Sequence, residues 1–173
     1  RQAASATFYP TAPGARVDEA DPTRPRANIL FRSDLDQQVT VIDGVYPEPM
    51  PEDTGAPIQA LIGTTTAESM GIEVGDEFDL HPYWEATTGP LRIVVVGIGT
   101  EIDPDTRYWG AVDERLDARE RTWLTLRAWV PETSFFGAVL QAMPTMASDY
   151  LNIYQVQHEE LNARNALPIA NGL

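Results

Sequence analysis

The strongest constraint on the fold is an apolar run near the middle of the chain. Residues Leu91–Ile98 read LRIVVVGI and are apolar at nearly every position. A strand exposed on one face alternates apolar and polar residues, so an almost unbroken run indicates a strand covered on both faces. The run is also far shorter than the ~20 residues of a membrane-spanning helix. It therefore predicts a central strand of a sheet.

Shorter patterns on both sides of this run predict further strands and a few short helices. β-branched residues fill Gln38–Ile42, and the following Asp-Gly pair is typical of a turn. Thr64–Met70 is predicted to be a helix that ends at Gly71, and alternation in Phe78–His81 predicts a half-buried strand. These patterns favour the α+β class, a β-rich mixed domain with a few short helices. Further strands are predicted at 28–31, 57–62, 124–130 and 150–156, and further helices at 131–143 and 158–167.

The first 36 residues differ from the rest of the chain in composition. They are rich in Pro, Ala, Thr and Arg, and proline cannot donate to a strand ladder. We therefore expect an extended, Pro-rich lead-in over residues 1–36 and an α+β domain over residues 37–173, whose C-terminal boundary stays open. The prolines of the lead-in are Pro10, Pro13, Pro22 and Pro25.

Composition excludes several classes of function. Twelve basic and 26 acidic residues among 173 give a formal net charge of −14, which repels nucleic-acid phosphates and anionic lipid head groups. Every basic residue is arginine, so Schiff-base lysines and P-loop lysines are excluded. The chain also has no cysteine, which excludes disulfides, thiol nucleophiles and thiolate metal sites. We expect no nucleic-acid partner.

Two patterns that could indicate catalysis or cofactor binding are weak. Residues 95–99 follow an apolar strand as a dinucleotide-binding loop would, but Ile102 and Pro104 stand where a third glycine and a helix are needed. His81 and His158 are the only histidines, and no Gly-x-Ser-x-Gly motif supplies a serine for them to activate. We therefore predict no catalytic residue, no cofactor-binding residue and no enzymatic activity.

Acidic residues offer oxygen ligands to a hard cation such as calcium. Asp103 and Asp105 lie close to Glu101 in the sequence. An Asp-Pro-Asp segment is also ordinary turn chemistry, so the prediction is that no metal is bound. A weaker version of the same pattern combines His81 with Asp79 or Glu85.

One segment has a more specific form. Residues Ala67–Leu80 combine a short helix, a glycine that ends it, a Val74–Asp76 turn and a strand. This order resembles an element in the extracytoplasmic domains of FtsX/MacB-type ABC transporter permeases. In that family the element follows an "eG-x-x-P" segment and precedes a "VvGi" strand. Ile42–Pro47 and Ile93–Ile98 are similar to these two flanks.

Two later segments extend the resemblance. Glu101–Trp109 looks like the "dp-x-d-x-yW" segment of large bacterial members, and Trp129–Phe136 is similar to their "vpe-x-x-F" helix start. The resemblance covers roughly residues 38–165. It implies a fold like that of the MacB-type periplasmic core domain.

The resemblance also implies a function and a location. Such domains are noncatalytic and lie on the extracytoplasmic side of the bacterial plasma membrane, between the first two transmembrane helices of a permease. They contact substrate or partner proteins, with a protein or lipid-like substrate expected here. Through the transmembrane part of the same permease they are coupled to a cytoplasmic ATPase subunit. The chain would then be an ectodomain cut from its permease, and its matching motifs are scaffold turns that transfer no substrate-contacting residue.

Two other classes of function stay open. The first is a freestanding ligand-binding module built on a small β-barrel of double-psi type, which also contains helix-then-Gly-Asp turns. The two-fold symmetry of such a barrel would repeat the turn, whereas only Gly75-Asp76 is present. The second is a hydrolase or metal-dependent enzyme that uses His81, Asp103 and Asp105.

Overall fold

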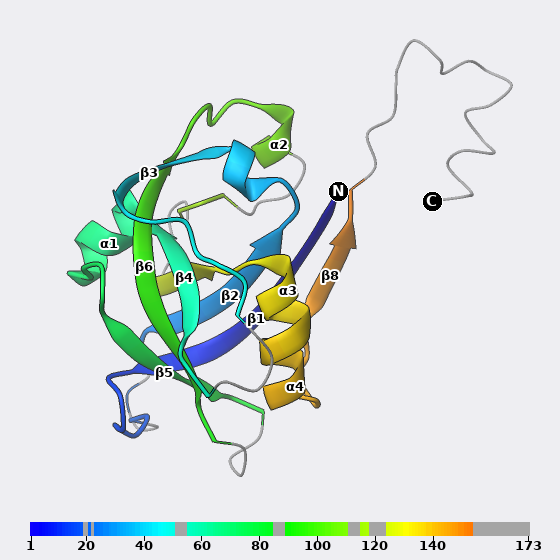
Figure 1. Cartoon of the computed structure of the whole chain (residues 1–173). Coiled ribbons are helices and arrows are strands. Elements are labelled where there is room, and N and C mark those ends of the chain that lie inside the picture. The colour runs from blue at the N-terminus through cyan, green and yellow to red at the C-terminus, as the bar shows by residue number, and fades with distance from the viewer. Residues whose placement is uncertain are drawn as a thin grey trace, which may run out of the picture.

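The apolar run Leu91–Ile98 lies in strand β6 (Leu91–Glu101), which pairs along both of its edges, as the sequence predicted. The computed structural model describes residues 1–153 except 19, 20, 22, 51–54, 85–88, 111–114 and 118–123. Six strands close into a barrel in the order β1–β2–β7–β4–β6–β5 (Figure 1). The other five are β1 (Gln2–Thr11), β2 (Arg26–Arg32), β4 (Ile58–Gly63), β5 (Glu77–Pro82) and β7 (Thr125–Trp129).

The pairing of these strands repeats in two halves. β1 pairs antiparallel with β2 as β5 does with β6, and β2 pairs parallel with β7 as β6 does with β4. If β1 is exchanged with β5, β2 with β6, and β4 with β7, every strand still has the same neighbours around the barrel. A helical segment follows each half: α1 (Thr64–Met70) after β4, and α3 (Glu132–Ser134), η2 (Phe135–Val139) and α4 (Leu140–Ala142) after β7.

The expected α+β fold of the MacB-type periplasmic core domain is wrong. Of the described residues, 42% lie in strands and 18% in helices, and the centre of the structure is the closed barrel. Periodicity shows which side of a strand is buried but not which strand lies beside it. Here strands far apart in the sequence pair, as where Arg26 lies opposite Thr125. The two-fold pairing does not depend on a second Gly-Asp turn. In the second half, the helical segment that ends with α4 is followed by Pro144-Thr145 instead.

Residues 1–36 form part of the barrel, which corrects the expected lead-in. β1 pairs with β2 over residues 3–8, with β5 over residues 8–11 and with β8 (Asp149–Asn152) over residues 2–5. Pro10 lies near the end of β1, opposite Leu80, while Pro13 and Pro25 lie between β1 and β2. The prolines thus gather where β1 ends and in the following connection, so they leave most of both ladders intact.

Three elements lie outside the barrel near one end of β6: η1 (Leu35–Gln37), β3 (Val39–Gly44) and α2 (Arg107–Gly110). β3 pairs antiparallel with β6, and a bulge at Ile42 shifts their register. β3 approaches β6 so closely that a Cβ on Gly97 would overlap the backbone oxygen of Val45. Glycine at position 97 is therefore required by the strand crossing.

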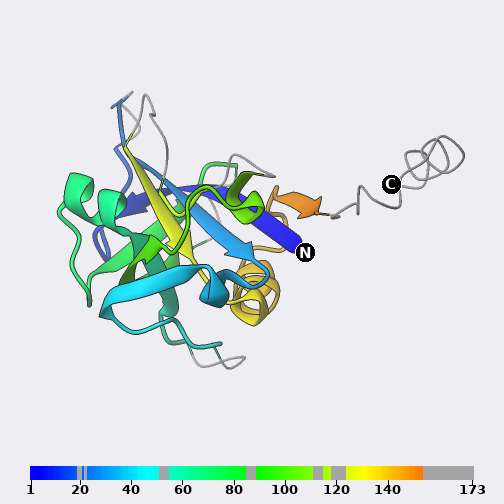
Figure 2. The same cartoon turned by 90° about the horizontal axis from the view of Figure 1, so that it is seen from above.

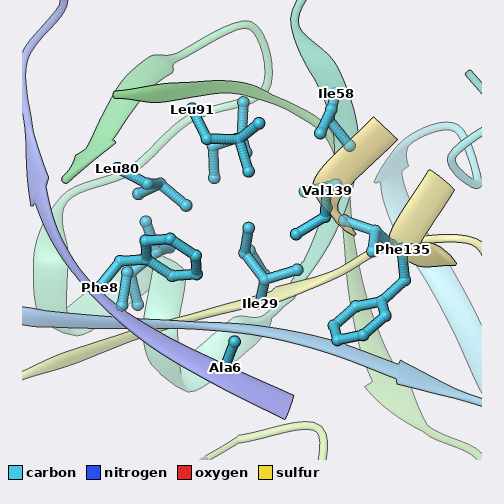
Figure 3. Close-up of a cluster of buried hydrophobic side chains, with 14 of the residues drawn as sticks. Ala6, Phe8, Ile29, Ile58, Leu80, Leu91, Phe135 and Val139 are labelled. Carbon is cyan, nitrogen blue, oxygen red and sulfur yellow. The ribbon is translucent and has the colours of Figure 1, made fainter. Parts of the chain in front are cut away.

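Two apolar clusters stabilise this arrangement. The larger lies inside the barrel, where Figure 3 shows Phe8, Ile29 and Leu80 pointing toward one another from β1, β2 and β5. Phe135 and Val139 reach the same cluster from η2. The smaller cluster is formed by buried residues from the β2, β4 and β7 strands and from the elements outside the barrel: Leu30, Leu35, Val39, Leu61, Tyr108, Trp109, Leu116 and Trp129.

Most predicted elements are confirmed. α1 matches the expected helix, and Gly71 ends it in the left-handed conformation with φ of 65°. The helix expected at 131–143 is α3 to α4, with a π-helical turn in η2. The strand expected at 150–156 is represented by β8 in its first part. The predicted helix at 158–167 lies outside the described residues.

Candidate functional site

His81 lies in a polar group on the outer surface of β1, β5 and β6. Nε2 of His81 is 3.0 Å from the hydroxyl of Thr11. Beside it, the carboxylate of Asp79 accepts hydrogen bonds from the backbone N–H of Gly14 at 2.6 Å and from Nε of Arg92 at 2.8 Å. Sequence reasoning had named His81 and Asp79 but missed the other three, which only strand pairing brings into contact.

The Asp79 carboxylate is held in its charged form. Hydrogen bonds from Arg92 lower the pKa of Asp79, and they outweigh the opposing effect of burial. Within the described part of the chain, no carboxylate hydrogen-bonds to His81, so the Thr11–His81 pair lacks the third group that orients a catalytic base. The arrangement fastens the connection after β1 to the barrel, which is a structural role.

The acidic residues after β6 also have structural partners. Asp103 accepts the backbone N–H of Asp105 at 3.0 Å, which closes a turn. Glu101 accepts the N–H of Leu116 at 2.9 Å and lies 3.4 Å from a guanidinium nitrogen of Arg115. Among the described residues, no three His, Asp or Glu side chains form a group that could hold a metal ion. Glu85 and His158 lie outside the described residues.

Residues 95–99 lie within β6, not in a loop. Gly97 and Gly99 face β3, and a Cβ on Gly99 would lie 3.1 Å from the backbone oxygen of Thr40. Their lack of a side chain admits a neighbouring strand, so it has a packing explanation that needs no phosphate.

The Gly75-Asp76 turn is anchored to the barrel and borders a shallow hollow. Gly75, with φ of 102°, donates its N–H to the backbone oxygen of Val95 at 2.7 Å, and Asp76 accepts the N–H of Glu73 at 2.9 Å. The hollow, of about 520 Å³, combines apolar and acidic side chains, which suit a cationic or amphipathic ligand. It is lined by Ala12, Pro13, Met70, Gly71, Ile72, Gly75, Asp76, Glu77 and Phe78.

The start of β1 and the end of β8 lie side by side. The α-amino group of Arg1 donates to the backbone oxygen of Ile153 at 3.1 Å, and the N–H of Ile153 donates to the oxygen of Arg1 at 2.7 Å. Gln2 is then paired with Asn152. Figures 1 and 2 both show the N mark next to β8. Positions 1 and 153 are thus direct neighbours on one side of the barrel.

One structural contact had no local signal in the sequence. Asp117 accepts the backbone N–H groups of Thr65 at 3.1 Å and Thr66 at 2.8 Å, and so caps α1 from a distant segment. The residue at the N-cap position, Gly63, has no side chain that could do so. The helix that the motif predicts therefore depends on the connection between β6 and β7.

Comparison with known proteins adds no assignment. No protein-family model matches the chain, and no curated protein matches it. None of the helices in the described parts of the chain is long and apolar enough to cross a membrane.

Proposed function

We propose that the chain is a noncatalytic extracytoplasmic domain of an ABC-type permease, which contacts substrate or partner proteins during ATP-driven transport. The observation that carries this proposal is the pairing of Arg1 with Ile153. A domain inserted between two consecutive membrane helices leaves and returns to one membrane surface, so neighbouring attachment points suit it. The order of the sequence motifs is the other support for this placement, although the fold that the same resemblance implied is wrong.

The strand pairing explains how such a domain could be coupled to its attachments. β1 pairs with β8 at its start and with β5 near its end, while β2 lies along its other edge. A displacement of the segment before β1 therefore acts on both halves of the barrel through one strand. A packed interior transmits such a displacement with little compression. The barrel would therefore move as one rigid unit together with β1 and β8.

The location can be tested with the complete gene that encodes this chain. The protein is expressed in a bacterial host, and membrane and soluble fractions are probed with an antibody against the barrel. We expect the barrel in the membrane fraction, and we expect protease added to intact spheroplasts to digest it. A cytoplasmic protein that survives the same treatment is the control. Recovery of the barrel in a soluble fraction, or protection from the protease, would overturn the proposal.

A freestanding ligand-binding module is the second candidate. The two-fold strand pairing and the hollow beside the Gly75-Asp76 turn favour it, because small closed barrels often bind ligands at their surface openings. The fractionation separates the two candidates, since a freestanding module is recovered without membranes. In that case the ligand would be sought among cationic and amphipathic small molecules, with Glu77→Gln as the first variant.

A further inference from the structure

β3 is an edge strand whose outer edge has no strand partner among the described residues. The backbone oxygen of Gln38 accepts the N–H of Ile102 at 2.9 Å. Hydrogen-bonded and non-hydrogen-bonded pairs alternate along an antiparallel ladder. Thr40 is therefore bonded to β6, whereas Val39 and Val41 direct their backbone N–H and C=O groups away from it. Val39 is only 6% exposed, so Val41, which is partly exposed, is the residue that offers its outward groups to another strand.

Few of the usual features protect this edge. Natural edge strands are often very short or carry lysine or proline, which discourage pairing with another chain. β3 has six residues, VTVIDG, without a basic residue or a proline. The bulge at Ile42 leaves the preceding Val39–Val41 segment in regular register. β8, the other strand outside the barrel, is only four residues long.

Apolar side chains stand exposed where β3 ends. Ile42 is 58% exposed and Val45 is 61% exposed. Val74, from the turn before β5, lies against Gly44, where a Cβ would be 3.1 Å from its Cγ2 atom. These three exposed apolar side chains come from two segments of the chain, the end of β3 and the turn before β5.

Carboxylates surround the same edge. Asp36 precedes β3, Asp43 lies in it, and Glu73 and Asp76 flank Val74. Within the described residues, none of these four carboxylates forms an ion pair with an arginine. The charge of Asp36 contributes, after burial, to raising the pKa of Tyr46 to about 12. These carboxylates therefore give the edge a negative charge that no ion pair of the described residues neutralises.

We propose that the outer edge of β3 binds an extended segment of a partner protein in which apolar and basic residues alternate. The segment would add as a strand, with its backbone paired to Val41. Its apolar side chains would cover Ile42, Val45 and Val74, and its basic side chains would face the carboxylates. This surface belongs to the folded domain itself, so the inference does not depend on the permease proposal.

The probe is a hexapeptide of alternating arginine and valine, titrated into the full 173-residue chain labelled with ¹⁵N. We expect saturable shifts confined to the amides of β3 and of the 73–76 turn. Reversing two charges in Asp36→Lys/Asp43→Lys should weaken binding about tenfold at low salt, since each exposed pair contributes up to about 1 kcal/mol. The matched control, Asp149→Lys, makes the same change in β8 and should leave binding unaltered.

Backbone pairing is tested separately with Val41→Pro, which removes an outward N–H group but no bond to β6. Its spectrum should stay folded while peptide binding falls at least as far as in the charge-reversal variant. The proposal fails if a peptide of alternating glutamate and valine binds equally well, if the shifts fall on β8, or if no shift occurs at millimolar peptide. Light scattering that shows a dimer through β3 would also overturn it, because a second copy would then be the occupant.

Discussion

Single residues carry constraints that the surrounding strands impose. Gly97 is the clearest case, because the chain just after β3 passes close to β6 here, and a Cβ would overlap the oxygen of Val45 and lie 3.0 Å from Cδ1 of Leu61. Asp79 is another, because it is 2% exposed and joins the connection after β1 to a strand from the other half.

Gly97→Ala should destabilise the fold by about 1–3 kcal/mol, since overpacking forces the backbone to shift. Urea unfolding followed by circular dichroism measures this difference. Gly137→Ala is the matched control, because no atom lies within 4 Å of the Cβ position there. It should be neutral or stabilising by up to about 1 kcal/mol, as expected for alanine in a helix. Equal effects of the two variants would contradict the strand crossing.

Asp79→Asn should lower the free energy of unfolding at pH 7 by about 1–2 kcal/mol, because hydrogen bonds to the charged carboxylate are lost. The side chain of Arg92 is 46% exposed, so solvent weakens its ion pair with Asp79. We therefore expect a loss of stability at the lower end of that range. The folded-state pKa of Asp79 is lowered, so its contribution is complete above the unfolded value of ~3.9 and decreases as pH falls through the folded value.

The gap between wild type and Asp79→Asn should therefore close in acid. Urea titrations at pH 7 and pH 3 measure it, with Asp149→Asn as an exposed control that should show little difference at either pH. A gap that widens as pH falls would contradict the assigned direction.

At the scale of elements, α1 shows how a local motif relies on distant chain. Its end is encoded locally by Gly71, but its start is capped by Asp117, which also accepts the hydroxyl of Thr66 at 2.8 Å. A carboxylate at this position also interacts favourably with the positive end of the helix dipole.

Asp117→Ala should cost about 1 kcal/mol, the usual effect of losing an N-terminal cap. Asp117→Asn should recover part of this loss, because its amide oxygen can still accept one hydrogen bond. Hydrogen exchange at the amides of Thr65 and Thr66 reports the cap directly, and it should accelerate in the alanine variant. Unchanged exchange at both amides would show that the cap is not formed in solution.

At the scale of the whole molecule, the two-fold strand pairing and the β1–β8 ladder determine how the described segments are arranged. The pairing of Arg1 with Ile153 makes Gln2 and Asn152 a non-hydrogen-bonded pair, whose side chains lie closest in an antiparallel ladder. The absence of native cysteine allows this adjacency to be tested by a single introduced disulfide.

Gln2→Cys/Asn152→Cys should form a disulfide on mild oxidation and stabilise the domain by about 2–4 kcal/mol relative to the reduced form. Gel mobility and thermal unfolding, with and without reductant, measure both effects. Gln2→Cys/Leu151→Cys is the control, because neighbouring residues of a strand point to opposite faces and its cysteines should crosslink poorly. Equal crosslinking of the two pairs would argue against the β1–β8 register.

Sequence patterns predicted single elements well and their assembly poorly. The run in β6, the strand expected at 124–130 and the glycine after α1 are local signals, and each element was found where expected. The first 36 residues were misjudged because proline counts suggested a lead-in, although the prolines sit at the end of β1 and between the strands. His81 and Asp79 were weak candidates in the sequence, but their partners Thr11, Gly14 and Arg92 come from other segments of the chain.

By itself, the sequence determined most of the strands except β1, the residue at which α1 ends, and the reactions for which the chain has no suitable side chain. These properties depend on neighbouring residues and on composition. Only the tertiary structure decided that six strands close into a barrel, that Asp117 caps α1 and that positions 1 and 153 adjoin. The physical reason is that side-chain periodicity defines a buried face but leaves the partner of that face unspecified. Partners are selected by packing among segments that lie far apart along the chain.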